Sequence, residues 1–191
     1  MTGTTAGTSG PMRPRRQTRA GWTLVVGLGS PDRGDDAIGG EVARCVAALA
    51  LPRVDVMAHE DPTDLIELWA DYDAVVVVDA VSSGAPAGQV RVLETGAGLD
   101  PLPESAWART GRGGTHAFGL AEAVELARAL RRLPARVSVV GVEAGGFDHG
   151  APLSTELAAA VPAVAGVVAK VIARQRSDAS PLGTEGDHVP R

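Results

Sequence analysis

A run of apolar residues from Ala74 to Val78, closed by Asp79, constrains the fold of this chain more than any other feature. Its four consecutive valines have the length of one strand, and a strand that is apolar on both faces must be covered on both faces. Such strands belong to parallel sheets, whose crossover connections place helices on each side. The run therefore predicts an α/β protein.

The rest of the chain alternates strand-like and helix-like patterns. Further strands are expected at 23–28, 53–58, 89–94 and 137–142, of which 89–94 is typical of an edge strand that can run antiparallel. Apolar residues at helical spacing mark 38–49, 120–130 and 157–171, and a shorter helix follows Pro62. We expect the last helix to bend or restart at Pro162. This order predicts a three-layer α/β/α sandwich on a mostly parallel, mixed sheet of about five strands.

The two ends of the chain differ in composition from the region between them. Residues 1–20 and 177–191 lack apolar periodicity, so we expect two disordered tails around one domain at residues 21–176. The first tail is basic, and its paired Arg15 and Arg16 are reminiscent of an export signal. The apolar segment that such a signal needs does not follow, so we expect a cytoplasmic protein.

Composition also narrows the possible partners. Outside residues 1–20 the chain carries 14 basic and 23 acidic side chains, a net charge of -9, which is the wrong sign for a nucleic-acid surface. No apolar run approaches the roughly 18 to 20 residues of a membrane span. The single cysteine, Cys45, excludes an internal disulfide and lies on an apolar helix face, so we place it in the core. We expect a monomer with no nucleic-acid or membrane partner.

Acidic residues stand where two of the predicted strands end. The first strand passes through a glycine turn to Asp35 and Asp36, and Asp79 closes the valine run. Ligands of open α/β sheets bind outside the carboxyl ends of the strands, which favours a functional role. Asp35 or Asp36 can instead cap the following helix, but one cap needs one carboxylate. Asp79 can likewise cap a turn rather than face the cleft.

The glycine turn before these aspartates is similar to a nucleotide-binding loop. A dinucleotide fingerprint needs glycine where Asp32 stands, and a phosphate-binding loop needs lysine where Asp35 stands. Phosphate would therefore meet carboxylates where it requires hydrogen-bond donors. Nucleotide binding is kept only as a disfavoured alternative.

A histidine completes the candidate site. His116 follows the glycine-rich segment 111–114 just before a predicted helix, so we expect a loop-presented ring that suits a ligand. His59 follows the second strand and can approach the same edge of the sheet. Asp36, Asp79 and His116 together form a mixed oxygen and nitrogen set that suits Zn²⁺ or a similar divalent metal ion.

Five sequence blocks, in this order, resemble the nickel-iron hydrogenase maturation proteases. They are the Gly-x-Gly-Ser turn with Gly34–Gly39, Val78–Ala80 with Gly84, Pro86 and Gly88, Thr115–Leu120, Val140–Glu143, and the closing helix from Leu153 to Pro162. The resemblance implies that Asp36, Asp79 and His116 form the metal-binding and catalytic centre. Asp36 stands where many members have Glu, and residues 59–63 replace a glycine-rich segment of the family, which bears on substrate choice.

The resemblance also implies a function: an endopeptidase that removes a short C-terminal extension from the hydrogenase large-subunit precursor once nickel is in place. Two mechanisms are open. The site can hold its own ion, which activates water and polarises the scissile carbonyl. Alternatively it recognises the precursor's nickel, and a carboxylate acts as general base on water, which we favour. The competing function is a non-catalytic nickel-binding checkpoint or chaperone for the same large subunit.

Overall fold

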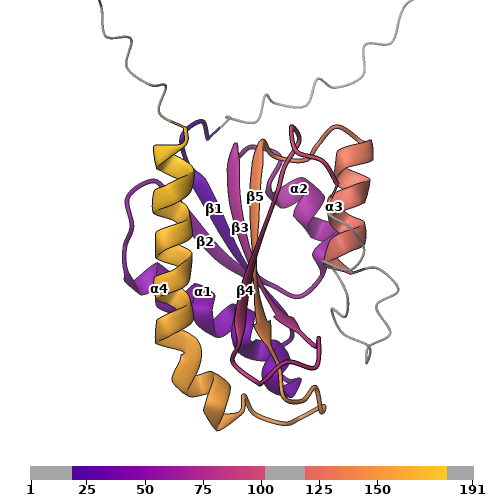
Figure 1. The fold of residues 1–191 in the computed structure, drawn as a ribbon, viewed down its shortest axis with the longest axis vertical. Helices are drawn as coiled ribbons and strands as arrows, with labels where there is room; N and C mark the ends of the chain where they lie inside the picture. The colour runs from indigo at the N-terminus through magenta and orange to yellow at the C-terminus, as the bar shows by residue number, and fades with distance from the viewer. Residues whose placement is uncertain (1–18, 102–118, 180–191) are drawn as a thin grey trace, which may run out of the picture.

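The computed structural model describes residues 19–101 and 119–179, in which five strands form one sheet (Figure 1). The sheet order is β2-β1-β3-β5-β4, with β1 at Thr23–Leu28, β2 at Val54–His59, β3 at Ala74–Val81, β4 at Val90–Thr95 and β5 at Arg136–Glu143. Four strands are parallel, and β4 runs antiparallel to β5 at one edge. The predicted mixed sheet and its antiparallel edge strand are confirmed.

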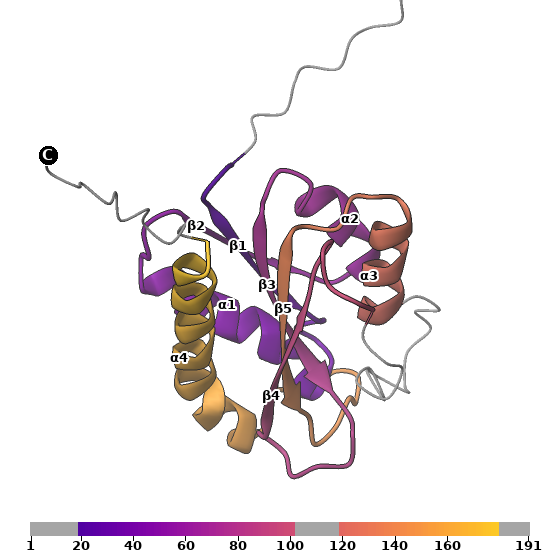
Figure 2. The same ribbon diagram turned by 45° about the horizontal axis from the view of Figure 1, so that its top comes forward.

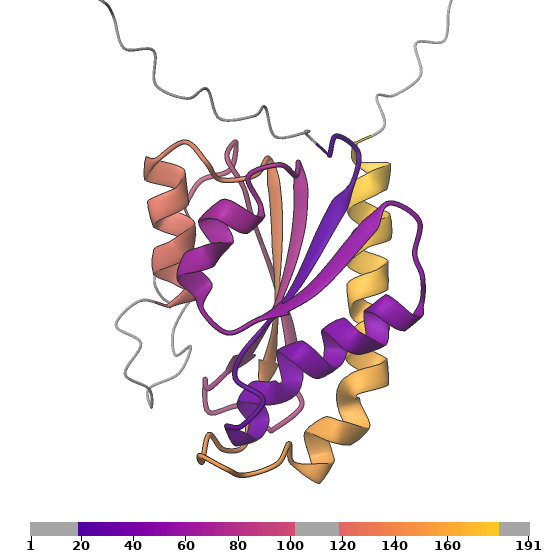
Figure 3. The same cartoon turned by 180° about the vertical axis from the view of Figure 1, so that it is seen from behind.

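Helices cover both faces of the sheet (Figures 2 and 3). They are α1 at Ile38–Ala48, α2 at Leu65–Leu68, α3 at Leu120–Ala129 and α4 at Thr155–Ser177, with short 3-10 turns η1 at Gly34–Ala37 and η2 at Pro62–Asp64. The buried residues of α1 and α4 pack on one face, and those of α2 and α3 pack on the other. The three-layer α/β/α arrangement is therefore the one that the sequence predicts.

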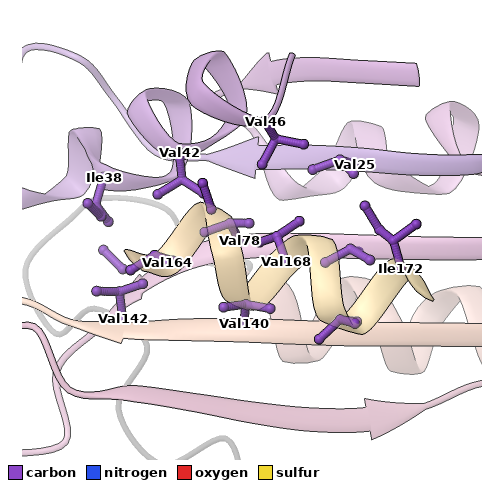
Figure 4. Packing of buried hydrophobic residues seen from close by; sticks show 14 of the residues in the cluster. Val25, Ile38, Val42, Val46, Val78, Val140, Val142, Val164, Val168 and Ile172 are labelled. Carbon is purple, nitrogen blue, oxygen red and sulfur yellow. The ribbon is translucent and has the colours of Figure 1, made fainter. Parts of the chain in front are cut away.

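The valine run of β3 explains why both faces need cover. Val76 and Val78 lie in the core under α1 and α4, whereas Val75 and Val77 lie in the core under α2 and α3. Figure 4 shows the first of these cores, in which the valines of α4 pack against the strands. Successive side chains of a strand point to opposite faces, so a continuous apolar strand feeds two cores at once.

Strand β3 is longer than its apolar run. It extends to Val81, because β5 offers ladder partners as far as Glu143. Asp79 therefore lies within the strand, opposite Gly141, and not directly after the strand as the sequence predicts. Asp79 is two residues after Val77, so its side chain points to the same face of the sheet, the one that α2 and α3 cover.

Helix α4 continues through Pro162 as one helix, so it does not restart there. Pro162 cannot donate to the carbonyl of Ala158, and Figure 1 shows the first turns of the helix inclined to the rest. By its length and mean hydropathy of 1.8, α4 could cross a membrane, although a core helix of a soluble protein meets the same criteria. In this structure Val164, Val168 and Ile172 are buried against the sheet.

Two further predictions concern single residues. Cys45 is a free thiol that is only half-buried, and it packs against the core beneath α1 and α4. Arg19, which we placed in the N-terminal tail, donates to Asp55 at 2.6 Å and lies over the ring of Trp22.

Candidate functional site

The Asp36 carboxylate lies in the turn between β1 and α1, at the carboxyl edge of the sheet. The backbone N–H of Ser30 donates to Asp36 Oδ2 at 2.9 Å. Gly29 has φ +120°, and a Cβ there would lie 1.9 Å from the Asp36 carbonyl oxygen, so only glycine allows this turn. The N-cap residue of α1 is Ala37, so Asp36 is not a helix cap. Its carboxylate instead orders the glycine turn, and among the described residues no hydrogen bond is made to its second oxygen.

Asp35 has a structural role that the sequence left undecided. It is 2% exposed, and its carboxylate accepts hydrogen bonds from the backbone N–H groups of Gly145, Gly146 and Ser154, at 2.7, 3.3 and 2.8 Å. Burial alone would raise its pKa, but these hydrogen bonds and one from the Ser154 side chain outweigh it and hold the pKa below 3.8. Asp35 thus ties the loop after β5 to the turn after β1.

A close approach of backbones brings the Asp36 turn to β3. A Cβ on Gly39 would lie 2.0 Å from the carbonyl oxygen of Leu28 and 2.7 Å from that of Val78. The first turn of α1 therefore lies directly on β1 and β3, at the point where Asp79 follows Val78. The short segment between Asp36 and Gly39 leaves the two carboxylates at the same edge.

Asp79 is half-buried, and the charge of Asp36 is one cause of its raised pKa. Burial raises the pKa of Asp79 to about 7, the negative charge of Asp36 adds to the rise, and a hydrogen bond from the backbone of Ala80 opposes it. Because the charge of Asp36 disfavours ionisation of Asp79, a cation bound beside Asp79 would stabilise its ionised form. The oxygen donors of Asp36 and Asp79 are of the kind that divalent metal ions take as ligands, and the metal ion itself stays a prediction.

Glu143 is a further carboxylate at this edge, to which sequence reasoning gave no role. It closes β5 as Asp79 closes the valine run, so the strand-end rule could have found it. It is 2% exposed and accepts hydrogen bonds from Ser83 N and Oγ, Gly84 N and Ala85 N, at 2.7 to 3.1 Å. Burial alone would raise its pKa, but these bonds lower it. Glu143 holds the loop after β3 rather than a ligand.

His116 lies outside the described residues, so its place beside the two aspartates stays a prediction. Helix α3 begins at Leu120, which is buried in the same core as Leu28 and Val77. In Figure 1 this end of α3 lies towards the carboxyl ends of the parallel strands. Within the described ranges, no three His, Cys, Asp or Glu side chains form a metal-binding group.

His59 ends β2 in register with Leu28, on the same face as Asp79. Its Nε2 lies 2.8 Å from Asp64 Oδ2, and a third of the side chain is exposed. Two strand spacings, on the order of 10 Å, separate it from β3. His59 thus lies at the same edge of the sheet as Asp79, but its described partner is Asp64.

The sequence model of the hydrogenase maturation proteases matches residues 52–171 of this chain, which is more than half of its length. The chain belongs to this family. Because the family consists of proteases, this hydrogenase maturation protease is a hydrolase. The matched region includes Asp79 and His116, whereas Asp36 precedes it.

Solved structures show the same fold. The hydrogenase maturating endopeptidase HybD from E. coli is 22% identical, with a TM-score of 0.64 over 83% of this chain and 99% of that one. The [NiFe] hydrogenase maturation protease HycI from Thermococcus kodakarensis is 22% identical, with a TM-score of 0.59 over 80% of this chain and 92% of that one. The hydrogenase 2 maturation peptidase from Thaumarchaeota archaeon SCGC_AB-539-E09 is 27% identical, with a TM-score of 0.57 over 80% of this chain and 98% of that one. No curated sequence is a significant match.

Proposed function

We propose that this hydrogenase maturation protease removes the C-terminal extension of a [NiFe] hydrogenase large-subunit precursor that has received its nickel, and that it does so in the cytoplasm. The single observation that carries the proposal is the half-buried carboxylate of Asp79 within reach of the charge of Asp36, at the ends of the parallel strands. The family match supports the substrate class. The acidic pair supports a site that attracts a cation rather than a phosphate.

We propose that Asp36, Asp79 and His116 grip the nickel of the precursor, so that only a loaded substrate is held at the site. Bound there, the metal ion would supply positive charge that compensates the two carboxylates. The pair is suited to this because one side chain is anchored by Ser30 N and the other by the β3 backbone. His116 would add the nitrogen ligand.

In the proposed reaction a water molecule attacks the carbonyl carbon of the scissile peptide bond. One carboxylate of the pair takes the proton of that water as general base. The C–N bond then breaks, and the proton passes to the leaving amine, so the products are a shortened large subunit and a free extension peptide. Asp79 and Asp36 are the two described groups that can hold this proton.

The decisive experiment mixes the purified protein with nickel-loaded and nickel-free precursor and weighs the products. We expect the loaded precursor alone to lose mass. Asp79→Asn should lower the cleavage rate at least 100-fold, the lower end of general-base contributions. Asp73→Asn is a matched control, because Asp73 is an exposed residue just before the opposite end of β3. Equal cutting of both precursors would refute recognition of nickel.

The competing proposal, a checkpoint that binds the loaded large subunit without cutting it, predicts a different result. The precursor would keep its full mass, yet it would co-purify with the wild-type protein and not with Asp79→Asn. The same mass measurement therefore separates the two functions.

A further inference from the structure

Strand β2 forms an edge of the sheet (Figure 3). The turn that carries Asp36 lies next to it, since Gly29 N donates to His59 O. Two hydrogen bonds fix the phase of its ladder with β1: Thr23 N donates to Arg53 O at 3.0 Å, and Gly29 N donates to His59 O at 3.1 Å. Backbone groups of a strand point alternately to its two sides. The backbone N–H and C=O groups of the odd-numbered residues of β2 therefore point towards β1. Those of the even-numbered residues point away from the sheet.

The outward-facing backbone groups belong to Val54, Val56 and Ala58. Among the described residues, no hydrogen bond is made to the outward N–H or C=O of these three. Val54 and Val56 are half-buried by their side chains, and Ala58 is exposed. A row of unpaired N–H and C=O groups on an edge strand is a template for an added strand.

The carboxyl end of this edge opens into a groove of about 430 Å³ between β2, the Asp36 turn and α1. The groove is lined by Gly29, Pro31, Ala37, Gly40, Glu41, Arg44, Ala58, His59, Glu60 and Asp61. Three of the lining residues are acidic and one, Arg44, is an arginine, which is paired with Glu41; Asp61 accepts hydrogen bonds from the backbone N–H and the hydroxyl of Thr63. Glu60 is exposed, and none of the ion pairs among the described residues includes it. The charge of the groove suits a cationic chain.

We propose that an extended, cationic stretch of the substrate polypeptide adds as a strand to the outer edge of β2 and crosses this groove towards Asp36 and Asp79. This inference rests on the proposed function, since it names how that substrate is held. Main-chain hydrogen bonds to the edge would supply affinity, and the carboxylates of the groove would select basic side chains.

The spacing of the sheet sets where the edge contacts fall on the substrate. Neighbouring strands are roughly 4.8 Å apart, so an added strand lies about 14 Å from β3 and Asp79. An extended chain covers that distance in about four residues. The residues that pair with β2 are therefore about four or more positions from the scissile bond, and they act on binding rather than on the chemical step.

The test replaces one outward N–H. Ala58→Pro removes that donor from an exposed residue while the ladder to β1, which uses the odd-numbered residues, stays complete. We expect the KM for the nickel-loaded precursor to rise about tenfold, with kcat nearly unchanged. Val92→Pro is the matched control, because Val92 is 37% exposed on the other edge strand, β4. The bond from Glu143 N to Gln89 O sets the phase that turns the Val92 backbone outward.

A second pair of variants tests the charge. Glu60→Lys reverses a charge in the groove, and Asp178→Lys makes the same change at the far end of α4. We expect only Glu60→Lys to raise the KM, and the difference between the two variants to shrink as ionic strength rises. Equal KM values for these two variants would contradict the proposed selection of a cationic chain.

A direct readout is residue-resolved hydrogen exchange of the wild-type protein in an excess of nickel-loaded precursor, which keeps the site occupied during labelling. The amides of Val56 and Ala58 should become protected when precursor is added, whereas that of Met57 is already bonded to β1. If the wild type cuts but these amides stay unprotected and Ala58→Pro behaves as the wild type, the edge inference is wrong and the proposed function stands.

Protection without any cleavage by the wild type has the opposite meaning: the edge inference stands, and the proposed function fails. Protection that appears in the protein alone and grows with its concentration would show that a second copy of the chain occupies β2. That result would overturn the inference.

Discussion

Replacing Asp79 by asparagine should stabilise the metal-free protein at neutral and alkaline pH. Burial, and after it the charge of Asp36, disfavours the ionised form of Asp79 and raises its pKa from the ordinary 3.8 to about 7 in the folded chain. A group whose pKa is raised by folding contributes its full stability below the unfolded pKa and loses it as the pH rises through the folded pKa. The loss therefore falls between pH 4 and pH 7.

The size of the effect follows from the shift. A change of about three pKa units is worth about 4 kcal/mol at 1.36 kcal/mol per unit, which is an upper limit because solvent reaches part of the side chain. Asparagine does not ionise, so Asp79→Asn escapes this loss. The difference in the free energy of unfolding between variant and wild type should be near zero at pH 4 and should rise to at most about 4 kcal/mol at pH 8.

Urea denaturation in the presence of a chelator, repeated from pH 4 to pH 8, measures this difference directly. Asp73→Asn serves as the control, and its difference from the wild type should stay within about 0.5 kcal/mol across the range. Adding nickel or zinc should stabilise the wild type and leave Asp79→Asn unchanged, because a ligand of the folded state raises its stability. A variant that is less stable than the wild type at pH 8 would refute the proposed repulsion at the site.

Three further predictions follow from the site and its supports. Asp35→Ala should lower the free energy of unfolding by about 3 to 5 kcal/mol in thermal or urea melts, since it strands three buried backbone donors; a loss below 1 kcal/mol would contradict that role. Gly39→Ala should prevent folding, as circular dichroism would show, because its Cβ would lie 2.0 Å from a backbone oxygen, whereas Gly166→Ala, with nothing within 4 Å, should stabilise α4 by about 0.5 to 1 kcal/mol. In calorimetric titrations with nickel, His116→Ala should lose affinity at least tenfold and His59→Ala should not; the reverse result would place His59 in the site.

The candidate site shows how far strand-end reasoning reaches. The rule that ligands bind at carboxyl ends singled out Asp79, and the structure places that residue beside Asp36. The same rule fits Glu143, whose carboxylate is consumed by the loop after β3. It also left Asp35 and Asp36 undivided, because adjacent residues differ in role only through the direction of their side chains. A rule about position along a strand cannot say which carboxylate has its oxygens occupied.

The sequence by itself determined the layers of this protein. The valines of β3 are stable only when both faces of the strand are buried. The apolar residues at helical spacing before and after this strand predict the helices that cover those faces. These are local, periodic properties, so they can be read from the order of residues. The edge strand β4 was also predicted from the sequence, and most of its side chains are exposed or half-buried, as its place at the edge of the sheet allows.

Only the tertiary structure decided the extent of β3 and the state of its aspartate. The strand runs on to Val81 because β5 continues beside it. The pKa of Asp79 rises because the folded chain buries its side chain and because the charge of Asp36, from a different part of the chain, adds to the rise. Contacts of this kind depend on how closely α1 can lie on the sheet, which Gly39 permits. Pairing, burial and charge interaction arise between segments distant in sequence, and no local pattern carries them.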